Sequence, residues 1–205
     1  MPDTLTDGSA STTTPAPPAP AEIVLPNVVW HPTGASGSRN GEQVVRVVVH
    51  RWGVAYTNEQ AEASSYHGVV NFFSNPANQA SAHIVFPGSA VPGEATQMVA
   101  WADKAWAESA YNASSDDVES ADAIWLGHDP HGMAVLARIV AFCLHQRGLP
   151  ATWSAEKGFC RHADLGAAGG GHTSCPTTDL ALWRAFCGLV EHETARGGFR
   201  PSWGQ

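Results

Sequence analysis

Basic residues are scarce in this chain, which has 11 lysines and arginines against 19 aspartates and glutamates. The formal net charge of -8 at pH 7 argues against nucleic acid as a partner, because binding to a phosphate backbone requires a basic surface. Long apolar runs are missing too. No stretch approaches the roughly 18 apolar residues that a bilayer-spanning helix needs, so we expect no membrane insertion.

Cysteine is also scarce, with four residues in a chain of 205. That number is too small for a disulfide scaffold, and two of the four fall on apolar faces of predicted helices, which favours a reduced compartment. The first twenty residues lack the basic start and apolar centre of a signal peptide. We therefore expect a chain without a secretion signal.

What the chain does have is enough apolar content, 43%, to bury the core of one domain. Residues 1–22 are rich in Pro, Ala and Thr, and they contain too few large apolar side chains to order themselves. We expect a disordered tail there, although a linker remnant is an equal alternative. Residues 23–205 are expected to form the functional domain, which we expect to be a monomer.

The apolar pattern predicts strands and helices that alternate along the chain. The most strongly predicted strand is the β-branched run at residues 44–50. Other strands are expected at residues 23–30, as an edge strand, and at 81–86 and 94–100. Helices are expected at residues 57–75, where positions 57–60 fit a capping box, at 129–148 and around 180–190. The order predicts one α/β domain with a mixed central β-sheet flanked by helices.

Residues 112–125 carry an acidic run in a partly apolar setting. A solvated surface is the commonest explanation for such a run. His83, within a predicted strand, is expected to be a core histidine or to support a ligand. Trp101, Trp106 and Trp125 could line a groove, although buried packing is their commoner use.

Two histidines and a cysteine lie beside a glycine run in residues 161–176, RHADLGAAGGGHTSCP. Glycines allow tight turns, so the backbone can bring His162, His172 and Cys175 round one point. Zinc suits such ligands, because it binds thiolate and imidazole in tetrahedral geometry and keeps a fourth position for water at catalytic sites. A missing ligand would have to come from elsewhere in the sequence, and His50, at the end of a predicted strand, is the best candidate.

The chain resembles the zinc-dependent N-acetylmuramoyl-L-alanine amidases of the type 2 class, whose fold is shared with peptidoglycan recognition proteins and phage amidase lysozymes. The likeness runs from about residue 28 to residue 186. It rests on several short motifs, each of which is weak evidence alone and which together give a strong signal. They are VVVH ending at His50, SAHIVF at 81–86, Ala105-Trp106 followed by Asn112 and Glu119, HADL at 162–165, and Cys175-Pro176.

The resemblance implies a zinc ion bound by His50, His162 and Cys175, with Glu119 as general acid and base. It implies hydrolysis of the amide between N-acetylmuramic acid and L-alanine in peptidoglycan, as in a phage endolysin. Such an enzyme would stay in the host cytoplasm before lysis and then act on the cell wall. His172 and Thr173 are expected to contact the substrate or the transition state.

Three departures from the family pattern affect this assignment. The loop before Cys175 is long and introduces His172, which competes with His162 as the second ligand. Thr173 stands where many members have a lysine, and Ala82 stands where one branch has a catalytic tyrosine. Three alternatives to an endolysin stay open at this point: a non-catalytic peptidoglycan-binding module, a wall-recycling amidase, and a cysteine peptidase that uses Cys175 or Cys160.

Overall fold

A six-stranded mixed sheet forms the centre of the protein, whose computed structural model describes residues 27–197. The strands lie in the order β1-β5-β4-β7-β3-β8, and β5 runs antiparallel to β4 whereas the other neighbouring pairs are parallel. Their bounds are β1 Asn27–Trp30, β3 Arg46–Arg51, β4 Ile84–Phe86, β5 Glu94–Gln97, β7 Ser115–Ser120 and β8 Gly158–Arg161.

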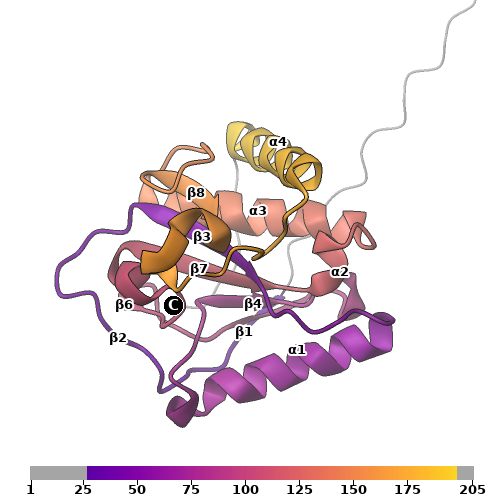
Figure 1. The fold of residues 1–205 in the computed structure, drawn as a ribbon, viewed down its shortest axis with the longest axis horizontal. Helices are drawn as coiled ribbons and strands as arrows, with labels where there is room; N and C mark the ends of the chain where they lie inside the picture. Colours follow the sequence, from indigo (N-terminus) through magenta and orange to yellow (C-terminus); the bar gives the residue numbers. More distant parts are fainter. Residues whose placement is uncertain (1–26, 198–205) are drawn as a thin grey trace, which may run out of the picture.

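Helices cover both faces of this sheet. Helix α1 (Glu59–Ser74) lies on one face, and the packed pair α3 (Pro130–Arg147) and α4 (Leu180–Arg196) lies on the other, as Figure 1 shows. The short α2 (Asp122–Trp125) follows β7 directly. The predicted fold class, one α/β domain with a mixed sheet flanked by helices, is confirmed. Within the described residues, no helix is both long and apolar enough to cross a membrane.

Strand β3 separates two buried regions because successive side chains on a strand point to opposite faces. Val47 and Val49 pack into the main core together with α3 and α4, whereas Val48 packs with Cys160 and Leu165 on the other face. The next residue on that second face is a histidine at the carboxyl end of the strand. This alternation therefore directs His50 away from the main core and towards the turn after β8.

Most predicted elements are present, with shifted ends. The predicted helix at 57–75 is α1, but the expected capping box at 57–60 is wrong: the cap is Asn58, whose side chain accepts a hydrogen bond from the Ala61 N–H. The described residues also form a small antiparallel sheet, β2 Gly37–Ser38 with β6 Asp103–Lys104, and four 3₁₀ helices: η1 Pro76–Asn78, η2 Gly88–Ala90, η3 Ser109–Ser114 and η4 His162–Gly169. The predicted tail at 1–22, and residues 23–26 of the predicted first strand, lie outside the described residues.

The acidic run at 112–125 is not a solvated surface. Its central part is β7, which lies between β4 and β3 in the middle of the sheet, and Asp116 and Asp117 are fully buried there. Asp116 is paired with Arg39 and Arg147, whose nitrogens lie 2.6 Å from its oxygens. Buried charges persist when they are paired, which explains how an acidic sequence can form a central strand.

Candidate metal centre

Three side chains from distant parts of the chain converge at the carboxyl end of β3. His50 belongs to β3, His162 begins the 3₁₀ segment η4 (His162–Gly169), and Cys175 precedes α4. A nitrogen of each histidine and the cysteine sulfur all lie within 4.8 Å of one another. The Ala163 N–H donates a hydrogen bond of 2.9 Å to the Cys175 carbonyl, which holds the cysteine segment against the turn that carries His162.

The hydrogen bonds around the two imidazoles decide which nitrogens are free. Nε2 of His162 lies 2.7 Å from the Gly169 carbonyl oxygen and Nε2 of His50 lies 3.1 Å from Oε1 of Glu108. Since a carbonyl and a carboxylate only accept, both Nε2 atoms donate, and in the neutral rings both Nδ1 atoms carry lone pairs. These Nδ1 atoms face each other at 3.0 Å. Two lone pairs at this separation repel unless a proton or a cation lies between them.

Two buried carboxylates lie behind His50. Glu108 and Asp117 are fully buried, and their oxygens lie 3.1 Å and 3.6 Å from Nε2 of His50. Burial alone lowers the pKa of His50, but hydrogen bonds to Asp117 and Cys175 outweigh it and raise that pKa well above 6.5. Burial and the charge of His50 lower the pKa of His162 to about 4. The surroundings of the two imidazoles therefore favour one positive charge between His50 and His162.

This donor set fits zinc. Two imidazole nitrogens and one thiolate form a three-ligand set of the kind found at catalytic zinc sites, and an imidazole that donates its other N–H to a carboxylate or a carbonyl is the usual supporting arrangement. Glu108, whose Oε2 is buried without a hydrogen-bond partner among the described residues, together with Asp117 and a Cys175 thiolate would supply negative charge around a divalent cation. The residues present therefore match the metal that the sequence predicts.

A pocket of about 430 Å³ opens in front of these ligands. His50, His162 and Cys175 all line it, together with Trp106 and Glu119. A second possible metal group in the described residues, made of His50, Glu108 and Asp117, is buried throughout. The first group alone combines a soft ligand with access for a substrate, so it is the group suited to catalysis.

Glu119 lies beside the ligands. Its position in β7 is paired with His50 of β3, its side chain is partly exposed to the pocket, and its Oε1 is buried without a hydrogen-bond partner among residues 27–197. Burial raises the pKa of Glu119 to about 7; the charge of His50 opposes this shift and those of Asp122 and Asp117 add to it. A carboxyl group with this pKa can accept and return a proton near neutrality.

Only some of the remaining predicted site residues line the pocket of the metal centre. His172 lines the pocket and lies against the His162 ring, with the ring centroids 4.4 Å apart. Thr173 is exposed and does not line the pocket, whereas the next residue, Ser174, does. The other cysteine considered as a nucleophile, Cys160, is fully buried in β8, and burial raises the pKa of its thiol to about 12. A cysteine-peptidase role for Cys160 is therefore wrong.

Of the tryptophans considered for a groove, Trp106 lines the pocket. Trp101 stacks on the His83 ring at 5.7 Å, and Trp125 packs against Trp183 in the main core. His83 is fully buried, and its Nδ1 accepts a hydrogen bond of 3.0 Å from the Asp117 N–H. His83 therefore supports Asp117, which confirms its expected place in the core.

Glu108 is the functional residue that the sequence analysis missed. A signal was present, because Glu108 lies between the Trp106 and Asn112 positions of the family motif. Oδ1 of Asn112 accepts hydrogen bonds from the N–H groups of Ala107 and Glu108, at 3.0 Å and 2.6 Å. The asparagine of the motif thus fixes the backbone that presents Glu108 to His50.

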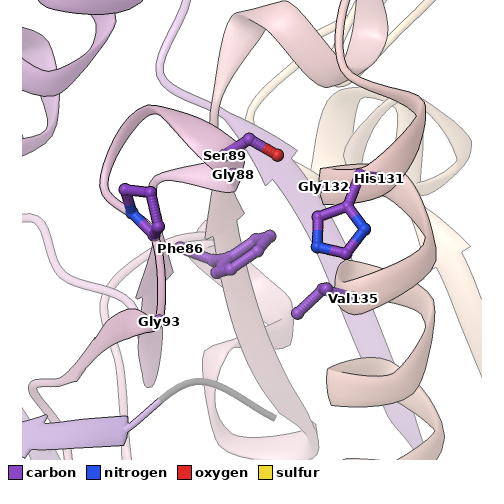
Figure 2. Close-up of a pocket in the computed structure, with 8 residues that line it drawn as sticks. Phe86, Gly88, Ser89, Gly93, His131, Gly132 and Val135 are labelled. Carbon is purple, nitrogen blue, oxygen red and sulfur yellow. The ribbon is translucent and has the colours of Figure 1, made fainter. Parts of the chain in front are cut away.

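Another pocket, of about 180 Å³, lies between the segment after β4 and the first turn of α3 (Figure 2). Ser89 and His131 lie on opposite sides of it, above Phe86 and Val135. The hydroxyl of Ser89 donates to Oδ1 of Asp129 at 2.7 Å, and among the described residues no hydrogen bond joins His131 to either one. These three residues therefore do not form a serine-hydrolase triad.

Comparisons with known structures find the same architecture. The hydrolase AmiA of Staphylococcus aureus, solved with its ligand, aligns at 15% identity over 84% of this chain and 85% of that one, with a TM-score of 0.58. The PlyG catalytic domain aligns at 17% identity over 82% and 95%, with a TM-score of 0.56. LysC of Clostridium intestinale, an N-acetylmuramoyl-L-alanine amidase, aligns at 14% over 80% and 97%, with a TM-score of 0.52.

No family model and no curated protein matches the sequence. The likeness to solved structures therefore establishes the fold, which is the one that N-acetylmuramoyl-L-alanine amidases adopt. It extends over most of this chain and over nearly all of LysC.

Proposed function

We propose that this protein is a zinc-dependent amidase that hydrolyses the bond between N-acetylmuramic acid and L-alanine in peptidoglycan. The observation that carries the proposal is the convergence of His50, His162 and Cys175 at the base of an open pocket that Glu119 also lines. The shared fold with LysC supports the choice of substrate. Bound zinc would supply a Lewis acid for the scissile carbonyl and would lower the pKa of a water molecule.

The chain's own residues have separate tasks in this reaction. His50, His162 and Cys175 would hold the metal, while Glu108 and the Gly169 carbonyl fix the two imidazoles in the tautomer that presents Nδ1. Glu119 would take a proton at the oxygen that faces the pocket, Oε2, from the attacking water and return it to the leaving amine of L-alanine.

His172 would line the pocket beside the reacting carbonyl. Because Thr173 does not line the pocket, its predicted substrate contact passes to the neighbouring Ser174 in this proposal. Both side chains offer hydrogen bonds to charge that develops on the carbonyl oxygen.

The experiment is a digest of purified peptidoglycan followed by mass spectrometry of the released fragments. We expect free L-alanine amino termini to appear, zinc to be present in stoichiometric amount, and chelation to abolish the release. Activity that resists chelation and is stopped by thiol alkylation would instead support a cysteine peptidase with Cys175 as nucleophile. Digesting intact sacculi and soluble muropeptides side by side separates the proposed wall lysis from a recycling activity.

Replacing the proposed base tests its role. Glu119→Gln keeps the shape of the side chain but removes its capacity to take a proton. We expect hydrolysis to fall by about 10²-fold or more with zinc content unchanged, measured as release of new amines together with metal analysis. A fully active Glu119→Gln protein would remove this residue from the mechanism.

A further inference from the structure

A second pocket, of about 400 Å³, adjoins the pocket of the metal centre. Arg51 lines both pockets. The chain segment after Cys175 separates the two: Cys175 lines the first, Thr177 and Thr178 line the second, and the cysteine sulfur lies 4.0 Å from the Arg51 carbonyl oxygen. The far side of the second pocket is formed by the end of α2 and the start of α4, through Trp125, Leu126, Gly127, Asp179 and Leu182.

Arg51 is the single cationic side chain among the residues that line this second pocket. It follows His50 directly, so the alternation along β3 places the imidazole and the guanidinium on opposite faces of the strand. The side chain is 27% exposed, and within residues 27–197 its one ionic contact joins Nε to Oδ1 of Asp122 at 3.5 Å. The two terminal nitrogens, Nη1 and Nη2, donate no hydrogen bond within the described part of the chain.

The remaining surroundings suit an anion with an aliphatic chain. Asp179 is the one acidic residue in the lining, and its Oδ1 already accepts hydrogen bonds from the N–H groups of Ala181 and Leu182 at the start of α4. The two threonine hydroxyls can donate further hydrogen bonds, and Leu126 and Leu182 give apolar surface. A planar guanidinium with its terminal fork free binds a carboxylate through two parallel hydrogen bonds.

We propose that this second pocket binds the peptide part of the substrate and that Arg51 recognises a free carboxylate on it. The inference rests on the proposed function, since it takes the pocket at the metal centre as the place of amide cleavage. The peptide would pass over Arg51 from one pocket into the other, with its carboxylate paired to Nη1 and Nη2.

The test uses two N-acetylmuramoyl peptides that differ in one group, a carboxylate or its carboxamide on the residue after L-alanine. We expect the zinc-loaded protein to have a kcat/KM at least about tenfold higher for the carboxylate form, because a charge-assisted pair is lost in the other. In Arg51→Gln this ratio should fall to about one. Arg184→Gln, which removes an exposed arginine of α4 outside both pockets, should keep the ratio of the unaltered protein.

A binding measurement makes the inference independent of turnover. The peptide L-alanyl-D-glutamate and its fully amidated form are titrated into the unaltered, Arg51→Gln and Arg184→Gln proteins, with binding followed by NMR chemical shifts. We expect the acidic peptide to bind more tightly, and Arg51→Gln alone to lose the difference.

The outcomes separate the two proposals. Tight binding of the acidic peptide without cleavage of either substrate would overturn the proposed function and support the peptide site. Cleavage of both substrates with equal kcat/KM would overturn the peptide site and leave the function intact. A preference that persists in Arg51→Gln, or that also disappears in Arg184→Gln, would show that Arg51 is not the recognising group.

Discussion

At the scale of single residues, the state of the two histidines depends on what lies behind them. Nδ1 of His50 and Nδ1 of His162 face each other at 3.0 Å because each opposite nitrogen is committed to an acceptor. The acceptors are therefore part of the centre although they would not touch the metal. Glu108 is the acceptor whose replacement isolates this effect, since its carboxylate is fully buried.

We predict that Glu108→Gln weakens zinc binding by about 10-fold to 100-fold, the usual cost of losing a carboxylate that supports a ligating histidine. The measurement is a competition titration against a chromophoric chelator. Glu42→Gln, at an exposed loop position, is the matched control and should bind zinc as the unaltered protein does. Equal affinities for the two variants would mean that Glu108 does not orient His50.

The two histidines of the glycine-rich segment are predicted to behave differently. His162→Ala should lose stoichiometric zinc, because it removes one of the three converging donors, whereas His172→Ala should retain zinc and lose part of the activity. Metal analysis of the purified variants, together with the peptidoglycan digest, distinguishes the two roles. Retention of zinc by His162→Ala and its loss from His172→Ala would reverse the assignment.

At the scale of elements, the residue that caps a helix can also connect that helix to a neighbouring segment of the fold. Asp129 caps α3 by accepting a hydrogen bond from the Gly132 N–H at 2.8 Å, and it also accepts from the N–H and hydroxyl of Ser89, both at 2.7 Å. The same carboxylate thus joins the start of α3 to the segment after β4. Asp179 caps α4 in a similar way, but its capping bonds stay within its own helix.

Replacing each capping aspartate in a separate variant tests whether the bonds from Ser89 to Asp129 add stability. We predict that Asp179→Ala lowers the free energy of unfolding by about 1 kcal/mol, the usual cost of a lost cap. Asp129→Ala should cost about 2 kcal/mol or more, because the half-buried donors of Ser89 also lose their acceptor. Urea unfolding followed by circular dichroism measures both values, and equal losses would show that the bonds to Ser89 add nothing.

How far the elements could be predicted depends on their length and pattern. The β-branched run that became β3 and the capped helix α3 are long and regular, so local sequence was sufficient for them. Strands β2 and β6 have two residues each, too few for any period to show. The acidic strand β7 was obscured because its buried aspartates depend on arginines far away in sequence, at positions 39 and 147.

The site was predictable to a different degree. His50 and His162 are 112 residues apart, and no local pattern brings them together. Their convergence was expected from the resemblance to a family, and the structure places them side by side. The support from Glu108 and the second pocket at Arg51 depend on the side-chain directions of a residue just before a 3₁₀ helix and of one at a strand end, which periodicity does not describe.

At the scale of the whole molecule, the proposed metal ligands join three parts of the fold: strand β3, the turn after β8 and the segment before α4. A ligand that binds only the folded state stabilises it, by about 2.7 kcal/mol at a concentration 100 times Kd. We predict that chelation lowers Tm by about 5 to 10 °C and that added zinc restores it, measured by calorimetry. In Cys175→Ala both shifts should largely disappear; an unchanged response would place the bound metal elsewhere.

Under the two proposals, the alternation of side chains along β3 would link catalysis to substrate recognition through two consecutive residues. His50 and Arg51 are consecutive: His50 lines the pocket of the metal centre, whereas Arg51 borders that pocket and also reaches the second one. Inserting or deleting one residue within β3 would exchange the two side chains, with a guanidinium facing Cys175 and an imidazole facing α4. If both proposals hold, the length of this strand is constrained twice, once by the metal ligand and once by the peptide contact.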